Sequence, residues 1–149
     1  MKLIDALQIT GSPVDEGSPV LRVFLACGFT PLHVRTFLDA HLRQHIPGTR
    51  PEIRTGVFGD LVGNIERLNA TQTDTLVVAL EWSDLDRRLG IRNLGGWRPA
   101  DVADIVQSAE RNALRLRHAI SNAAHELATH RCTECISSSS RHLPELEFS

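Results

Sequence analysis

The chain has 149 residues, with 16 Lys and Arg against 18 Asp and Glu, and a formal net charge of −2 at pH 7. This length suits one domain with a single core. The balanced charge lacks the basic excess that nucleic acid or an anionic membrane surface would attract, so neither partner is expected. No apolar run reaches the roughly 18 to 20 residues that cross a bilayer. The odd number of cysteines is typical of a reducing compartment, and we expect a cytoplasmic protein.

Taken in chain order, residues 1–20 form a short amphipathic segment followed by a loop, and they are interpreted as an N-terminal extension. Residues 21–27 (LRVFLAC) form a nearly continuous apolar run, which is typical of a strand buried on both faces of a parallel sheet. Thr30 and Pro31 are residues that favour a helix start, and Pro47 marks the end of that helix.

The same alternation continues along the chain. We expect a second strand at residues 52–58, a helix at 61–69 and a third strand at 74–80. Residues 81–97 are polar and rich in glycine, which predicts a loop with one short turn. From 99 to about 129 the apolar spacing predicts the longest helix.

Strands that alternate with helices predict an α/β fold, a three-layer α/β/α sandwich with a parallel sheet. Three strands are few for such a sheet, so we expect the fold to be incomplete at its C-terminus. The predicted domain covers residues 21–130, and residues 131–149 are predicted to be a degenerate strand or a disordered tail.

The candidate site lies after the strands, because open parallel sheets bind ligands at the carboxyl ends of their strands. The predicted junctions are Gly28-Phe29-Thr30, the stretch 56–60 and the stretch Glu81-Trp82-Ser83-Asp84. Glycines there also serve ordinary turns, and a threonine before a proline is often only a helix cap. The residue types alone therefore leave both a functional cleft and plain turn chemistry open.

Three stretches at these junctions resemble the SGNH/GDSL hydrolase-like superfamily. They are LACGFTPLHV at 25–34, RTGVFGDL at 54–61 and VVALEWSDLD at 77–86. The chain is most similar to the hydrolase-like proteins and N-terminal domains found beside FkbH-like enzymes in bacterial biosynthetic clusters. The resemblance implies that the three-layer fold is of the SGNH or flavodoxin-like kind. It also implies ester or acyl hydrolysis and a small ester or acyl substrate.

By this resemblance Thr30 stands at the position of the family's nucleophilic serine. Gly59 would supply an oxyanion-stabilising amide, followed by the acid Asp60. Glu81 and Ser83 follow the third strand, where the family has an asparagine, and Gly28 belongs to the first substrate-facing turn. These departures, and the absence of a C-terminal Asp-x-x-His, predict that hydrolysis is weak or lost, since a hydroxyl needs a base to become a nucleophile.

Two alternatives stay open. The chain could be a non-catalytic module that binds a ligand or associates with itself through an open sheet edge. Alternatively, His130, Cys132, Cys135 and His142 could hold zinc in the C-terminal tail, although their spacing matches no common zinc finger. No motif predicts a cofactor.

Overall fold

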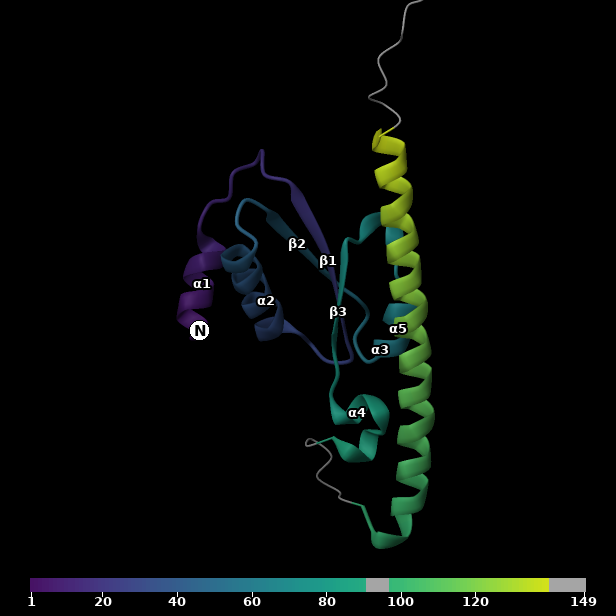
Figure 1. Cartoon of the computed structure of the whole chain (residues 1–149). Helices are drawn as coiled ribbons and strands as arrows, with labels where there is room; N and C mark the ends of the chain where they lie inside the picture. Colours follow the sequence, from purple (N-terminus) through teal and green to yellow (C-terminus); the bar gives the residue numbers. More distant parts are fainter. Residues whose placement is uncertain (91–96, 140–149) are drawn as a thin grey trace, which may run out of the picture.

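The computed structural model describes residues 1–90 and 97–139, with side chains described as far as Arg131. Its elements, in chain order, are α1 (Leu3–Gly11), β1 (Val20–Cys27), α2 (Leu32–His45), β2 (Arg50–Thr55), α3 (Leu61–Glu66), η1 (Ala70–Gln72), β3 (Thr75–Ala79), α4 (Trp82–Leu85), η2 (Arg87–Leu89), η3 (Pro99–Asp101) and α5 (Val102–Ser139). The three strands form one parallel sheet of order β2-β1-β3, which confirms the predicted parallel α/β class (Figure 1).

The strand order determines where the helices lie. In the register of the sheet, Val23 of the central strand β1 pairs with Ile53 of β2 on one side and Thr75 of β3 on the other. Because β2 and β3 flank β1 on opposite sides, right-handed crossovers place α2 and α3 on opposite faces of the sheet. Figure 1 shows this arrangement, with α1 and α2 on one side and α3 and α5 on the other.

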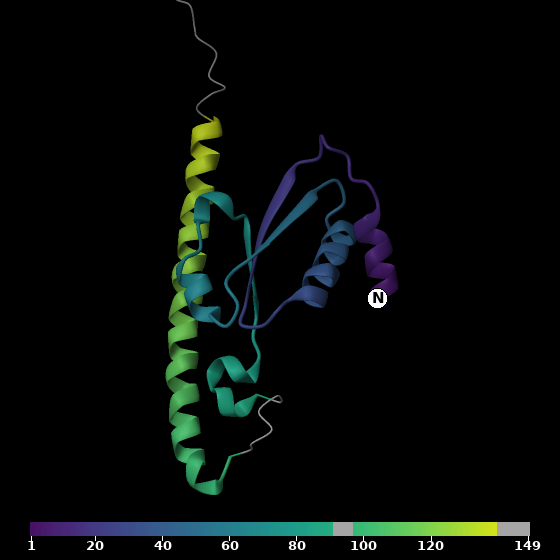
Figure 2. The same ribbon diagram turned by 180° about the vertical axis from the view of Figure 1, so that it is seen from behind.

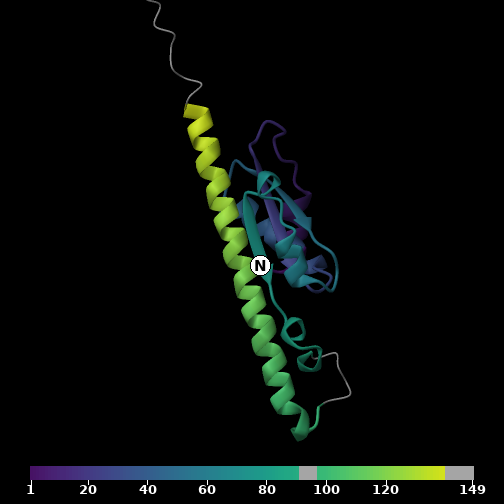
Figure 3. The same cartoon turned by 90° about the vertical axis from the view of Figure 1, so that its right-hand side faces the viewer.

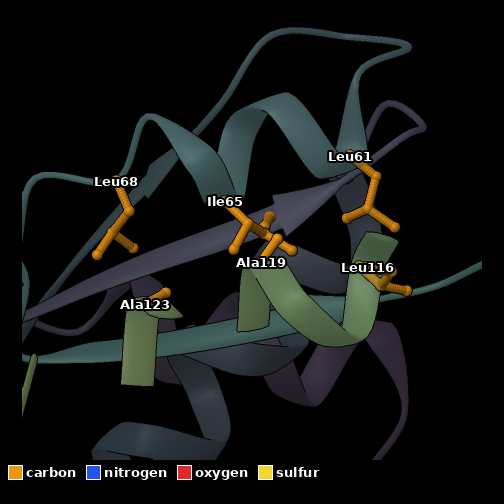
Figure 4. Close-up of a cluster of buried hydrophobic side chains, with 7 residues drawn as sticks. Leu61, Ile65, Leu68, Leu116, Ala119 and Ala123 are labelled. Atoms are coloured by element: carbon orange, nitrogen blue, oxygen red, sulfur yellow. The ribbon is translucent and has the colours of Figure 1, made fainter. Parts of the chain in front are cut away.

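Alternate residues of β1 supply the two cores, since successive side chains of a strand point to opposite faces. On the α2 face, Val23, Leu25 and Cys27 pack with Ile53 of β2. The other core lies on the α3 and α5 face, where α3 and its exit meet α5 (Figure 4). Its buried members are Ala26, Leu61, Ile65, Leu68, Leu116, Ala119 and Ala123.

The N-terminal residues form a helix that packs on the domain. Helix α1 packs against α2 on its outer side, as the view from behind shows (Figure 2). Ala6 of α1 and Ala40 of α2 are both fully buried, and small residues let two helices approach closely. Arg43 of α2 donates a hydrogen bond of 2.9 Å to the carbonyl oxygen of Ser12. Residues 3–11 are therefore an outer layer of this fold.

Helix α5 is longer than the sequence predicted. It continues to Ser139 and extends past the sheet at both ends (Figure 3). The prediction of a strand or disordered tail from residue 131 is therefore wrong for residues 131–139, which are helical; residues 140–149 lie outside the described part of the chain. Val102 and Val106, which belong to the apolar spacing of this helix, are exposed whereas Ile105 is buried, so only part of that spacing faces the core. Among the described residues, no helix combines the length and apolar character needed to cross a bilayer.

Two other boundaries differ from the predictions. Strand β2 ends at Thr55, because the chain turns at Gly56 to let a helix side chain approach its backbone. The predicted loop after β3 contains two short helical elements, α4 and η2, before residues 91–96, which lie outside the described part. Both differences fall at the carboxyl edge of the sheet, where the candidate site lies.

Candidate functional site

The exits of all three strands meet at one edge of the sheet. The amide of Gly59, in the loop after β2, donates to the carbonyl oxygen of Gly28 after β1 at 3.0 Å. From the third exit, the carboxylate of Asp84 lies directly over Gly28. A Cβ at position 28 would lie 1.8 Å from Asp84 Oδ1, so a larger residue fits here only if the Asp84 carboxylate moves. The predicted convergence of the three junctions is present.

Gly59 is held in a conformation that favours glycine. Its φ of +78° lies in the left-handed region. The resemblance assigned its amide to an oxyanion, yet that amide already donates to Gly28. An oxyanion hole needs a donor aimed at the substrate oxygen. In this structure the Gly59 N–H joins two loops instead.

Asp60 has a structural role at the start of α3. Its Oδ1 accepts a hydrogen bond of 3.0 Å from the Gly63 amide, which caps the helix. Its Oδ2 forms an ion pair of 2.8 Å with Arg67. The Arg67 guanidinium and the Gly63 amide together lower the pKa of the Asp60 carboxyl below its usual value. Asp60 is therefore an ionised helix cap.

The third exit begins α4 through a reciprocal cap. The Glu81 amide donates to Asp84 Oδ2 at 2.8 Å, and the Asp84 amide donates to the Glu81 main-chain carbonyl oxygen at 3.0 Å. The Ser83 hydroxyl donates to Glu81 Oε2 at 3.4 Å. Glu81 remains exposed, and a carboxylate has more acceptor positions than the bond from Ser83 uses.

Thr30, the predicted nucleophile, is separate from this cluster. It is exposed, and its hydroxyl forms no hydrogen bond with any residue that the structure describes. It does not cap α2 either, because Pro31 occupies the N-cap position. Two crevices lie at this edge, and neither contains Thr30 or a histidine among its described lining residues. A hydroxyl without a nearby base is not activated for attack.

The larger crevice lies between the exits of β1 and β3 and has a volume of about 670 Å³. We call it the aromatic crevice, because apolar and aromatic side chains form most of its wall: Phe29, Phe58, Leu80, Trp82 and Leu89. Glu81, Ser83 and Arg87 supply its polar groups. The helices that follow β1 and β3 lie on opposite faces of the sheet, and ligands of open α/β sheets bind at such a switch point.

The second crevice, of about 430 Å³, lies between α3, α4 and α5, and we call it the polar crevice. It shares Ser83 and Arg87 with the aromatic crevice. Its buried acid, Asp86, accepts hydrogen bonds from Arg88 Nε at 2.9 Å and Nη2 at 2.8 Å. These bonds lower the pKa of Asp86 well below its usual range. Arg88 also pairs with Asp104 at 2.8 Å, so these charges are already matched within the fold.

One residue of this edge was not predicted from the sequence. Asn64 is buried on α3; its Oδ1 accepts from the Val57 amide at 2.7 Å, and its Nδ2 donates to the Val57 carbonyl at 2.8 Å. Its side chain lies against Gly56, where a Cβ would meet it at 2.2 Å. Asn64 thus holds the loop after β2. The sequence did contain a sign of this role: Asn64 shares the helical spacing of the apolar residues Leu61, Ile65 and Leu68, so its amide is expected on the buried face of α3.

The cysteine at the first exit is not a reactive group. Cys27 is buried, and its thiol donates to the Phe29 carbonyl oxygen at 3.2 Å. Burial raises the pKa of this thiol, and the thiolate is the reactive form of cysteine.

The zinc candidates are only partly covered by the structure. His130 is half-buried on α5, the side chains of Cys132 and Cys135 lie beyond the described ones, and His142 lies outside the described residues. Within the described part of the chain, no group of three His, Cys, Asp or Glu residues could hold a metal ion.

Comparison with family models, with curated proteins and with solved structures gives no match to this chain.

Proposed function

We propose that the chain is a non-catalytic binding module that holds a small, largely apolar ligand in the aromatic crevice. The observation that carries this proposal is the composition of the crevice wall at the switch point of the sheet. Phe58 and Trp82 are each 70% exposed there. Large aromatic side chains are rarely left in water without a partner, and a crevice of about 670 Å³ is in the range of small-molecule sites.

The family resemblance remains part of the proposal. A strand order of β2-β1-β3 with helices on both faces supports an SGNH-like or flavodoxin-like three-layer architecture. Within it, a small acyl or ester group would approach the exits of β1 and β3. Thr30 lies outside the crevice, and the Gly59 amide is engaged, so we propose binding without efficient hydrolysis. The buried free thiol of Cys27 supports a reducing, cytoplasmic location.

Binding can be tested with butyranilide, which carries an acyl chain and an aromatic ring on a bond that resists hydrolysis. Titration followed by NMR should show saturable shifts at the exits of β1 and β3. Phe58→Ala should weaken binding about tenfold, the scale of one lost aromatic contact. Leu32→Ala is the matched control, because Leu32 is similarly exposed, at 69%, but does not line the crevice. The proposal would be contradicted if the shifts did not saturate, or if Phe58→Ala and Leu32→Ala changed the affinity equally.

Hydrolysis is tested separately with p-nitrophenyl butyrate. We expect no turnover above that of buffer, and the same rate for wild type and Thr30→Ala. Turnover that disappears in Thr30→Ala would show that the threonine acts as a nucleophile and would replace the non-catalytic proposal with an esterase.

A second candidate function is self-association through the outer edge of β3. The Asp74 amide donates to the Arg22 carbonyl of β1, so by alternation Thr75, Val77 and Ala79 direct their amide and carbonyl groups away from β1. No described strand pairs with that edge. β3 also lacks the charges and prolines that commonly protect an edge, whereas the other edge strand, β2, reads RPEIRT.

The mass of the protein in solution tests this second candidate. Light scattering during size-exclusion chromatography should give a multiple of 16.5 kDa. Val77→Pro should restore the monomer mass, because it removes an outward amide, and proline is tolerated at the edge of a sheet. Val77→Ala is the control, since it keeps the amide. A wild-type monomer at all concentrations would exclude self-association.

A further inference from the structure

The aromatic residues of the chain are unevenly distributed. The sequence contains five Phe, two Trp and no Tyr. Phe29, Phe58 and Trp82 come from three different strand exits and line the same crevice. Ring faces carry negative electrostatic potential, so several rings around one space attract a cation.

A carboxylate lies in the same wall. Glu81 is exposed, and its carboxylate retains acceptor capacity beyond the hydrogen bond from Ser83. Asp84 borders the site through its contact with Gly28. Arg87 also lines the crevice but is engaged in an interaction of its own. A cation that enters the crevice therefore meets aromatic rings and a carboxylate.

We propose that the ligand of the aromatic crevice carries a quaternary or methylated ammonium group. This inference rests on the proposed binding function and specifies the class of its ligand. A trimethylammonium group has the two properties that the wall matches: an apolar surface that packs on Phe58 and Trp82, and a diffuse positive charge that the rings and Glu81 attract. A bare ammonium would lose more hydration on entering such a site.

Three compounds of nearly the same shape but different charge test whether a positive charge on the ligand strengthens binding. Choline carries a trimethylammonium group, 3,3-dimethylbutan-1-ol is its neutral isostere, and 3,3-dimethylbutanoate is an anion of similar size. We expect NMR titration of the wild-type protein to show choline binding about tenfold more tightly than the neutral alcohol, and the anion binding most weakly. The shifted amides should lie at the exits of β1 and β3.

Two variants test whether Trp82 and Glu81 cause the preference for choline over the neutral alcohol. Trp82→Leu keeps an apolar side chain but removes the ring, so choline affinity should fall about tenfold while the neutral alcohol changes less than about threefold. Glu81→Gln keeps the cap at the start of α4 but removes the charge, and it should reduce the preference for choline over the alcohol. Trp97→Leu and Glu52→Gln are matched controls, because both residues are exposed and neither lines the crevice.

The outcomes distinguish this inference from the proposed function. Equal binding of choline and the neutral alcohol would overturn the cation inference and leave an apolar binding site. Tightest binding of the anion would also overturn it and would point to Arg87. If butyranilide binds but choline does not, the ligand class is wrong; if none of these compounds binds, the proposed function fails as well.

Discussion

The two crevices on either side of α4 differ in how their groups are used. In the polar crevice, Asp60, Asp86 and Arg88 are bound to other parts of the fold. In the aromatic crevice, Phe58 and Trp82 project into solvent. Charged groups that are already paired stabilise the fold, whereas exposed rings leave free energy available for a ligand. Polar residues near a strand exit are therefore not by themselves a binding site.

The largest effect on stability is expected from Asp86→Asn in the polar crevice. Asp86 accepts hydrogen bonds from the Arg88 backbone and guanidinium, and the amide loses the charge that strengthens them. We expect a loss of about 1 to 2 kcal/mol in the free energy of unfolding, measured by urea denaturation. Binding of choline in the aromatic crevice should stay unchanged. A variant as stable as wild type would show that these bonds add nothing to the fold.

The same crevice should make the protein sensitive to acid. The pKa values of Asp60 and Asp86 are lowered in the folded state, chiefly by hydrogen bonds from Arg67 and Arg88. A lowered pKa stabilises the fold above the unfolded value, near 3.9, and that contribution is lost as the pH falls through the folded pKa. Urea denaturation from pH 7 to pH 2.5 should therefore show stability falling below about pH 4. The gap between wild type and Asp86→Asn should narrow over the same range, because the folded pKa of Asp86 lies well below its usual value.

Gly28 lines the aromatic crevice, and the side chain of Asp84, which lines the polar crevice, lies directly over it. Gly28→Ala therefore affects both crevices. The new Cβ would displace the Asp84 carboxylate, which then loses its hydrogen bond from the Glu81 amide. We expect a cost of about 1 kcal/mol in stability, together with weaker ligand binding, because the start of α4 shifts. Gly11→Ala is the control, since a Cβ there meets nothing within 4 Å. Unchanged stability and binding would mean that Asp84 moves aside freely.

Much of this arrangement was predictable from the sequence. Apolar runs indicated the three strands, and the principle of strand exits indicated which loops meet. The roles of the residues were not predictable, because they depend on hydrogen bonds between loops that are distant in sequence. Gly59 donates to Gly28, and Asn64 binds Val57, through contacts that only the folded chain creates. The length of α5 was also missed, since residues 131–139 carry a weak apolar pattern although they continue the helix.

The smallest loss of stability is expected from variants of the aromatic crevice, although these variants should weaken ligand binding most. Phe58 and Trp82 are exposed, so Phe58→Ala and Trp82→Leu remove little buried area and should change the free energy of unfolding by less than about 0.5 kcal/mol. The same variants should weaken choline binding about tenfold. Measuring both quantities on one preparation separates the two crevices directly. If either variant destabilised the fold as much as Asp86→Asn does, its ring would be part of the core, and the aromatic crevice would be a structural contact without a ligand.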